Sequence, residues 1–273
     1  MKKFFCVLSV VVLAVCLIFT GCKKENELAI RVGGSTSVNP LMEMFQEAYA
    51  NVNENISITV SATGSGDGIR NAASGTYDLG MSSRELTAAE MGTDIVPVIV
   101  AMDGIAVIVN NSNPVSNLTA EQINQIYTGE ITLWEDLGDA AQGKTGAIAV
   151  ISRESGSGTR GAFEEILGFQ DQLVSGASII NSTGAIKAAV TGNVDAIGYI
   201  SLGSVDNSSK ALNVGGVAAT AANVKTGTYV IARPFILMHQ RSVAPNSQTS
   251  AFLNWILGPE GQAIVQRSWI SVH

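Results

Sequence analysis

The chain has 273 residues and a formal charge of −7 at pH 7. A negative surface argues against nucleic acid as a partner, because a phosphate backbone selects basic surfaces. Only three cysteines are present, and all lie within the first 22 residues, so we expect neither a disulfide framework nor thiolate chemistry in the folded part.

The first residues have the pattern of an export signal. Two lysines precede an apolar stretch over residues 4–19, which is short for a membrane span, and Gly21 lies directly before Cys22. We expect residues 1–21 to be a lipoprotein signal peptide, Cys22 to carry the lipid, and residues 22–29 to form a tether. The alternative is an ordinary cleaved signal with an incidental cysteine. Processing would leave 14 of the 16 basic residues against 23 acidic ones, a formal charge of −9.

The first part of the mature chain alternates between strand and helix patterns. Runs rich in alternating or β-branched apolar residues predict strands at 28–34, 56–62, 77–82 and 95–110. Apolar residues at helical spacing predict a helix around Leu41 to Tyr49 and a shorter one at 69–73. Thr87 and Glu90 have the pattern of a capping box, and we expect the long run 95–110 to be broken near Asp103–Gly104.

The alternation continues after a turn-rich crossing at 110–118. Thr119 and Gln122 predict a second capping box, and GAIAVIS at 146–152 predicts a strand that leads into a glycine-rich turn and a helix. The run 228–239 reads as a strand interrupted by Pro234. The end of the chain reads as amphipathic helix with a break at Gly258–Pro259.

Strands that alternate with helices predict an α/β fold with mostly parallel sheets. Two β-rich crossings, near 109–114 and 230–236, indicate that a second lobe is inserted into the first. We therefore expect lobe I to comprise residues 30–109 and 235–273 and lobe II to comprise residues 110–234. The two crossings would form a hinge beside a cleft between the lobes.

Four glycine- and hydroxyl-rich turns each follow a predicted strand, and most of them open a helix. They are GGSTSVNP (33–40), ATGSGDGI (62–69), GMSSREL (80–86) and SRESGSGTRG (152–161). Free N–H groups at a helix start favour an anion, glycine lets the backbone approach it, and hydroxyls fill the gaps between amides. A single turn of this kind could be only a cap and a bend. Four of them at carboxyl ends of strands predict one anion site in the cleft.

Arg153 and Arg160 add positive charge around the last of these turns, and Arg84 does so in the third. A guanidinium suits an oxyanion because it can donate to two oxygens at once. Each arginine has a structural alternative, a surface ion pair, as for Arg160 with Glu164 at helical spacing.

A series of motifs in this order resembles the phosphate-binding proteins of bacterial ABC phosphate importers. They are GGSTSVNP, GTYDLGMSSREL, AMDGIAVIVN, IYTGEITLWEDL, SRESGSGTRGAFEE, AIGYIS, RPF and LGPEGQAIV. The resemblance runs from about Ile30 to the end, and SGSGTR is its most specific part. It implies a two-lobed, type II periplasmic-binding-protein fold in which each lobe is a mixed β-sheet flanked by helices, with a two-strand hinge. It also implies a monomeric receptor outside the cytoplasm that buries one phosphate and delivers it to a membrane permease.

The resemblance also implies which residues bind phosphate. They are Ser35, Thr36, Ser37, Ser65, Ser83, Arg153, Ser157, Gly158 and Thr159. Two departures stand out, because better-known relatives have an aspartate at the position of Ser83, where it accepts the proton of hydrogen phosphate, and another at that of Ser155. Since a buried carboxylate would accept that proton and repel sulfate, we expect a substitute acceptor. Asp103 is the first candidate and Asp67 the next, while Arg84 and Arg160 are further candidate ligands.

Three rival interpretations have less support. GDAAQGKT at 138–145 has the spacing of a nucleotide-binding loop, but it precedes a predicted strand instead of following one, so we treat it as coincidence. A serine hydrolase needs a base, and His239 and His273 both lie outside the four turns. No spacing of metal ligands is found, so we expect no metal, no cofactor and no enzyme activity. Sulfate, molybdate or tungstate would fit the same fold in place of phosphate.

Overall fold

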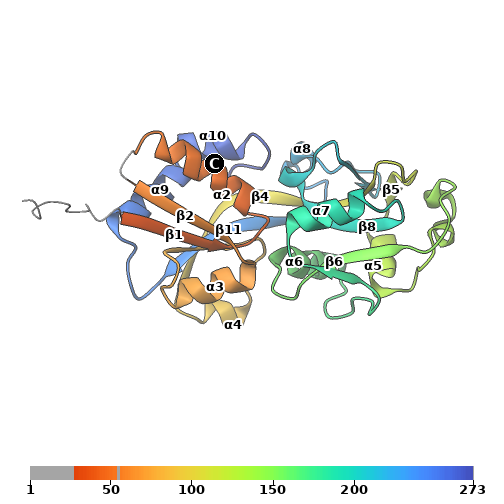
Figure 1. The fold of residues 1–273 in the computed structure, drawn as a ribbon, viewed down its shortest axis with the longest axis horizontal. Helices are drawn as coiled ribbons and strands as arrows, with labels where there is room; N and C mark the ends of the chain where they lie inside the picture. Colours follow the sequence, from red (N-terminus) through yellow and green to blue (C-terminus); the bar gives the residue numbers. More distant parts are fainter. Residues whose placement is uncertain (1–27, 54–55, 273) are drawn as a thin grey trace, which may run out of the picture.

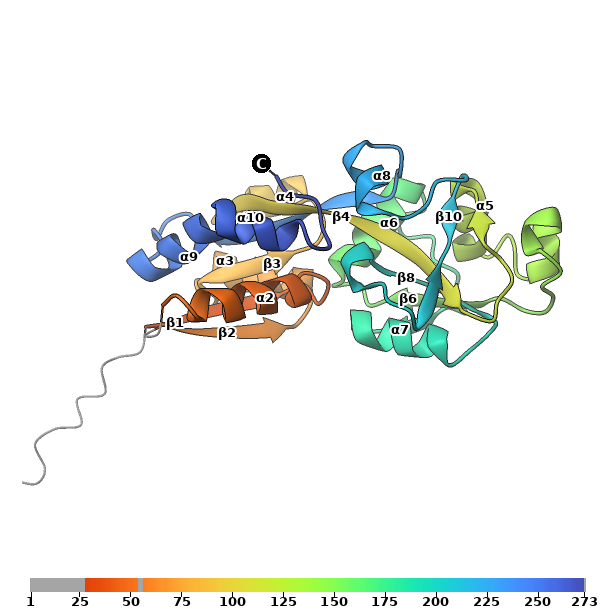
Figure 2. The ribbon, with the colours of Figure 1, turned by 90° about the horizontal axis from the view of Figure 1, so that it is seen from above.

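The computed structural model describes residues 28–53 and 56–272. It has two α/β lobes joined by the strands β4 (Ile95–Asn110) and β11 (Ala232–Gln240), which run side by side between them (Figures 1 and 2). The predicted signal peptide, Cys22 and most of the tether lie outside the described residues. Among the residues that are described, no helix has the length and apolar character needed to cross a membrane.

One mixed sheet passes through both lobes in the strand order β2-β1-β3-β11-β4-β8-β6-β7. In lobe I, β1 (Leu28–Gly34) pairs in parallel with β2 (Ile56–Ala62) and β3 (Leu79–Ser82). In lobe II, β6 (Ala149–Arg153) pairs in parallel with β7 (Ser178–Ile180) and β8 (Ala196–Ser201). The carboxyl ends of these parallel strands therefore lie together at one edge within each lobe.

Three short strands complete the β structure of the described residues. β9 (Ser209–Ala211) pairs antiparallel with the end of β4. β5 (Asn117–Leu118) and β10 (Asn213–Val214) form a separate two-stranded sheet in lobe II.

Strand β4 changes partners where it passes between the lobes. Its residues 95–104 pair with β11, and from Ile105 onward it pairs with β8. The strand is continuous, so the predicted break near Asp103–Gly104 is wrong: this point is a change of neighbour. The lobe boundaries set at 109/110 and 234/235 remain predictions.

The interruption of β11 at Pro234 is also wrong. Pro234 lies inside the strand and pairs with Met102, close to the first strand residue, Ala232. The irregularity follows it, as a register shift between Phe235 and Ile236. A proline is tolerated at a strand start or beside a bulge, where the missing N–H costs no regular ladder hydrogen bond.

Helices cover both faces of the sheet in lobe I (Figure 1). The first face carries α2 (Asn39–Ala50), α9 (Ser247–Leu257) and α10 (Pro259–Val265), which share a core with Val100 and Phe235. The second face carries α3 (Ser65–Ala73), which packs on Ile95 and Ile236. The helix α4 (Ala88–Met91) starts with the predicted capping box, and the predicted break at Gly258–Pro259 separates α9 from α10.

Lobe II is built the same way around the second half of β4. Ile105, Val107 and Val109 face a core that includes the helices α5 (Ala120–Thr128), α6 (Gly158–Leu167) and α8 (Ala221–Lys225) and the 3-10 helix η1 (Trp134–Ala141). Ala106 and Ile108 face α7 (Thr183–Thr191) on the other side, as the alternation of side chains along a strand requires. The short 3-10 helix η2 (Leu202–Ser204) follows β8.

Two local predictions in lobe II can be checked directly. Thr119 and Gln122 form the predicted capping box of α5, whose buried residues are Ile123, Ile126 and Tyr127. Residues 138–145 lie in η1 and the turn after it, and no helix follows them before β6. They therefore lack the strand, loop and helix order of a nucleotide-binding loop.

Candidate anion-binding site

The four glycine-rich turns meet where the two lobes face each other. The first three follow the parallel strands β1, β2 and β3 of lobe I, and the fourth follows β6 of lobe II. A backbone hydrogen bond joins the halves, since the amide of Gly66 donates to the carbonyl of Gly156 over 3.1 Å. The turns predicted to form one site thus come together.

The lobe I half is a connected set of serine hydroxyls. Ser35 Oγ donates to Ser83 Oγ over 2.8 Å, and Ser65 Oγ lies 3.4 Å from Ser83 Oγ. These three residues are at most 2% exposed. Gly34 makes the arrangement possible: its φ is +135°, and a Cβ there would lie 2.3 Å from the carbonyl oxygen of Met81.

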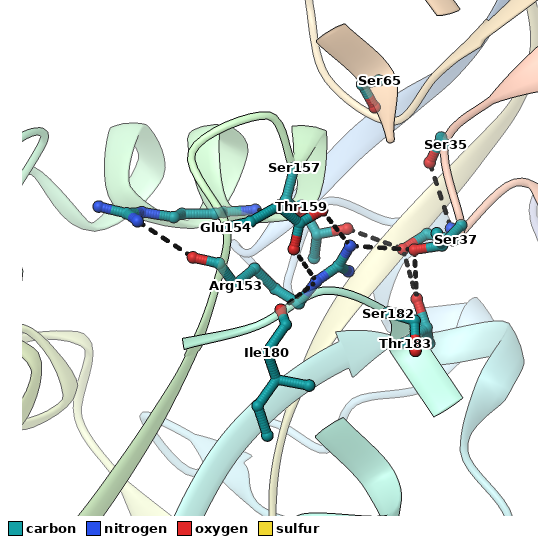
Figure 3. A network of polar contacts seen from close by, with 12 residues as sticks. Ser35, Ser37, Ser65, Arg153, Glu154, Ser157, Thr159, Ile180, Ser182 and Thr183 are labelled. Carbon is teal, nitrogen blue, oxygen red and sulfur yellow. Dashed lines mark hydrogen bonds and ion pairs between the residues drawn. The ribbon is translucent and has the colours of Figure 1, made fainter. Parts of the chain in front are cut away.

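The lobe II half carries the charge. Arg153 ends β6 and is 2% exposed. Its Nε and Nη2 donate to the two carboxylate oxygens of Glu154, each over 2.9 Å, and Nε also donates to the carbonyl of Ile180 over 3.2 Å (Figure 3). The sequence predicted no role for Glu154, because the resemblance pointed to the position of Ser155 for a carboxylate. The carboxylate that fixes this guanidinium is one residue earlier.

The start of α6 completes the turn after β6. Ser157 is the N-cap, and its hydroxyl accepts a hydrogen bond from the amide of Arg160. Gly158 is the first helical residue, where a Cβ would lie 2.3 Å from Ser65 Oγ and 2.9 Å from Ser83 Oγ of the opposite lobe. Only a glycine leaves room for lobe I at this position.

Side chains also bond across the lobes. Arg153 Nη2 donates to Thr36 Oγ1 over 3.0 Å, and Thr159 Oγ1 lies 2.7 Å from Ser37 Oγ. Thr36 is 9% exposed, and Ser37 and Thr159 are each 1% exposed. The structure therefore has its lobes closed on each other, with the polar groups of both halves buried at the contact.

A fifth turn, which the sequence analysis did not include, joins the other four. It follows β7 and opens α7, where Ser182 is the N-cap and Thr183 the first helical residue. Thr183 Oγ1 lies 3.1 Å from Ser37 Oγ (Figure 3) and 3.3 Å from Thr36 Oγ1. The signal for it was present as NSTGA (181–185), but β7 has three residues and the turn one glycine, so the pattern was weak.

We call the buried hydroxyls of these five turns the hydroxyl cluster. Its members are Ser35, Thr36, Ser37, Ser65, Ser83, Thr159 and Thr183.

Asp103 lies behind this cluster, in the hinge strand β4. Its Oδ1 accepts from Ser201 Oγ over 2.9 Å and its Oδ2 from Arg233 Nη2 over 3.0 Å, while Arg233 Nη1 donates to the carbonyl of Ser83 over 2.9 Å. Burial raises the pKa of Asp103 to about 6, although Arg233 and Ser201 act to lower it. From the sequence, Arg233 was identified only as part of the RPF motif. Its pairing with Asp103 was not predicted, because a single arginine in a β-rich run gives no sign of a buried partner.

The remaining candidates have partners of their own. Asp67 pairs with Arg70 on the outer side of α3, and Arg84 pairs with Glu90 over 2.7 Å. Arg160 pairs with Glu164 over 2.6 Å, which is the structural alternative foreseen from their spacing. Its Nη1 also donates to the carbonyl of Arg153 over 3.0 Å, so Arg160 supports the end of β6.

This arrangement suits the binding of a small oxyanion. It offers hydroxyls, backbone amides and one guanidinium that is already neutralised by a carboxylate, and such groups can all donate to anion oxygens. His239 is the only histidine among the described residues. It lies six residues along β11 from Arg233, roughly 20 Å at the rise of a strand, and so is remote from the serines.

Comparisons with known proteins agree with this architecture. A family model described as the PBP superfamily domain matches residues 23–260. The phosphate-binding protein PstS of Borreliella burgdorferi is 27% identical over 277 residues, which span 97% of each chain.

Two solved structures are more similar in sequence. A Clostridium perfringens protein, described as a phosphate ABC transporter substrate-binding protein with bound phosphate, is 42% identical, with a TM-score of 0.86 over 90% of this chain and 100% of its own. An ABC-type phosphate transport receptor from Vibrio cholerae is 36% identical, with a TM-score of 0.72 over 89% and 99% of the two chains. The chain therefore belongs to the PBP superfamily, in the family of phosphate ABC transporter substrate-binding proteins.

Proposed function

We propose that this protein captures inorganic phosphate between its lobes and delivers it to the permease of an ABC transporter. One observation carries the proposal: buried hydroxyls from turns of both lobes meet beside a buried guanidinium. The descriptions of the Clostridium perfringens and Vibrio cholerae proteins support phosphate as the anion.

The proposed ligands are the side chains and amides at the ends of the parallel strands. They are Ser35, Thr36, Ser37, Ser65, Ser83, Arg153, Ser157, Gly158 and Thr159. Asp103 would act on these ligands indirectly, because its two carboxylate oxygens already accept hydrogen bonds from Arg233 and Ser201. Hydroxyl oxygens such as Ser83 Oγ can accept hydrogen bonds as well as donate them. They can therefore accept the hydrogen bond that the O–H of hydrogen phosphate donates.

The energies allow tight and reversible capture. Each hydrogen bond to a charged partner contributes about 1.5–3 kcal/mol, and micromolar affinity needs only about 8 kcal/mol. Desolvation of the anion and closure of the lobes would absorb the remainder. The formal charge of −7 does not oppose binding, because local amide and hydroxyl dipoles face the anion.

The proposal extends to the surroundings of the protein. We infer that it is exported, that Cys22 carries a lipid that holds it to a bacterial membrane outside the cytoplasm, and that it works as a monomer. Nucleic acid and cofactors have no part in this function, and no catalytic step is assigned.

A calorimetric titration of the purified protein with phosphate, sulfate and molybdate tests the proposal. We expect one phosphate per chain and at least a hundredfold weaker binding of the other two anions. Repeating the titration as the pH is varied adds a control, because phosphate alone of the three changes its protonation near neutrality. Tighter binding of sulfate or molybdate would contradict the choice of anion. Hydrolysis of a phosphate ester that Ser157→Ala abolishes would instead indicate an enzyme.

A further inference from the structure

Helix α7 of lobe II brings one hydroxyl to two neighbouring residues of lobe I. Thr183 is its first residue and is 6% exposed. Its Oγ1 lies 3.1 Å from Ser37 Oγ and 3.3 Å from Thr36 Oγ1, and both of these residues belong to the turn between β1 and α2. These distances join parts of the chain almost 150 residues apart, and they can be kept only while the lobes are closed.

We propose that Thr183 is a positioning residue that holds the lobes closed and thereby sets the rate at which phosphate leaves. The inference rests on the proposed function and adds a residue outside the four predicted turns. Thr183 would act through Thr36 and Ser37 without binding the anion itself. Its hydrogen bonds form after the anion has entered, so they would slow release with little effect on capture.

The partners of Thr36 and Ser37 explain why a third hydroxyl matters. Thr36 Oγ1 accepts from Arg153 Nη2, and Ser37 Oγ bonds Thr159 Oγ1. A hydroxyl rotates freely until its hydrogen has a partner, and Thr183 limits that freedom for both residues at once. Thr36 and Ser37 therefore each have two hydrogen-bond partners in lobe II when the lobes are closed.

Thr183 also lines a groove between the two lobes. This groove has a volume of about 520 Å³, and its lining includes Thr36 and Asn39 from lobe I and Thr183, Lys187 and Asp206 from lobe II. Figure 3 shows Thr183 beside Ser37 in the hydroxyl cluster. Thr183 thus lines the groove and also belongs to the hydroxyl cluster. Its contacts with Thr36 and Ser37 lie between the groove and the rest of the cluster.

Local structure indicates that the hydroxyl of Thr183 is dispensable for folding. The hydroxyl of Ser182, not that of Thr183, caps α7 by accepting from the amide of Ala185 over 3.2 Å. Thr36 and Ser37 would each keep a partner if the Thr183 hydroxyl were removed. Valine has nearly the shape of threonine, so Thr183→Val should fold and lose only the interlobe hydrogen bonds.

The rates can be followed by tryptophan fluorescence. Trp269 of lobe I packs on Gly203 of lobe II so closely that a Cβ at Gly203 would lie 2.3 Å from the indole ring. Closure should therefore change the surroundings of this indole. Stopped-flow mixing of the protein with inorganic phosphate gives the association rate constant, and calorimetry gives the affinity; together they yield the dissociation rate constant.

We expect Thr183→Val to raise the dissociation rate constant about tenfold and to change the association rate constant less than twofold, since a neutral hydrogen bond is worth up to about one factor of ten. Thr183→Ser, which keeps the hydroxyl, should restore slow release. Thr191→Val makes the same change at the exposed end of the same helix and should leave both rate constants unchanged.

Two outcomes overturn the inference. If wild type and Thr183→Val bind phosphate with equal dissociation rate constants, Thr183 does not hold the lobes closed. If Thr183→Ser releases phosphate as fast as Thr183→Val, the hydroxyl is not the group that matters. Failure of the proposed function would look different, because wild type itself would then give no phosphate signal.

Discussion

The two halves of the site differ in chemistry. The lobe I half includes Ser35, Ser65 and Ser83, which are uncharged, and both Ser35 and Ser65 bond to Ser83. The lobe II half contains Arg153, whose guanidinium is held by Glu154 and by the carbonyl of Ile180. Both lobes offer hydroxyls and the starts of two helices, whereas lobe II adds one oriented positive group.

This difference shows why neither lobe is a complete site. Hydroxyls alone cannot offset the cost of removing an anion from water, and an arginine that is already paired leaves much of that cost unmet. When the lobes close, the two sets meet in a space away from bulk water, where each hydrogen bond is stronger. Changes to either half should therefore weaken binding, and the largest effect should come from the half that holds the charge.

Arg153→Ala should have the largest effect on binding. It removes the buried guanidinium of lobe II, and each charged hydrogen bond to the anion contributes about 1.5–3 kcal/mol. We therefore expect phosphate affinity to fall at least about tenfold, and at least about a hundredfold if two such bonds are lost. Arg31→Ala, which breaks the surface pair with Asp78, is the matched control. Unchanged affinity by calorimetry would remove Arg153 from the site.

Gly158→Ala should weaken binding about tenfold by keeping the halves apart. The new methyl group would lie 2.3 Å from Ser65 Oγ, and overpacking of this kind costs about 1–3 kcal/mol. Gly156→Ala is the control, because a Cβ there has no atom within 4 Å. Equal phosphate affinities of the two variants in calorimetry would show that the lobes close less tightly around the anion than they do here.

The hinge pair offers a test through stability instead of binding. Burial raises the pKa of Asp103 to about 6, with Arg233, Ser201, Tyr229 and the amide of Gly203 facing it. The folded protein then binds this proton more tightly than the unfolded chain does, so its contribution to stability is complete below about pH 4 and is lost as the pH rises through 6.

We therefore expect the free energy of unfolding of wild type to fall by about 2–3 kcal/mol relative to that of Asp103→Asn between pH 4 and pH 7. Urea denaturation of the two proteins at several pH values measures this difference. Asp139→Asn, at an exposed position of η1, should run parallel to wild type. A constant difference between Asp103→Asn and wild type would mean that Asp103 stays ionised throughout.

Asp67→Asn should have the smallest effect of the series. Asp67 pairs with Arg70 on a half-exposed surface of α3. We expect phosphate affinity to change less than twofold in calorimetry, since exposed pairs of this kind contribute little. A loss of discrimination against sulfate in this variant would instead identify Asp67 as the acceptor of the phosphate proton.

The sequence was most informative where local rules decide the structure. Both capping boxes and the break at Gly258–Pro259 depend on a few neighbouring residues, and all were predicted. The four glycine-rich turns could be placed together because carboxyl ends of parallel strands share an edge.

Partners that are distant in sequence could not be predicted. Arg233 and Asp103 are 130 residues apart and face each other only because β11 and β4 pair in one register. The continuity of β4 was missed for a related reason: glycine at 104 suggests a break, but the strand gains a new neighbour, β8, just beyond it. The turn before α7 was not predicted because the strand that precedes it, β7, has only three residues.

A crystal structure of the protein grown with phosphate tests the central claim most directly. The account predicts one anion enclosed by both lobes, within hydrogen-bond distance of hydroxyls of lobe I, such as those of Ser37 and Ser65, and of Arg153 and Thr159 of lobe II. An anion that contacts a single lobe, or that lies away from the hydroxyl cluster, would contradict it.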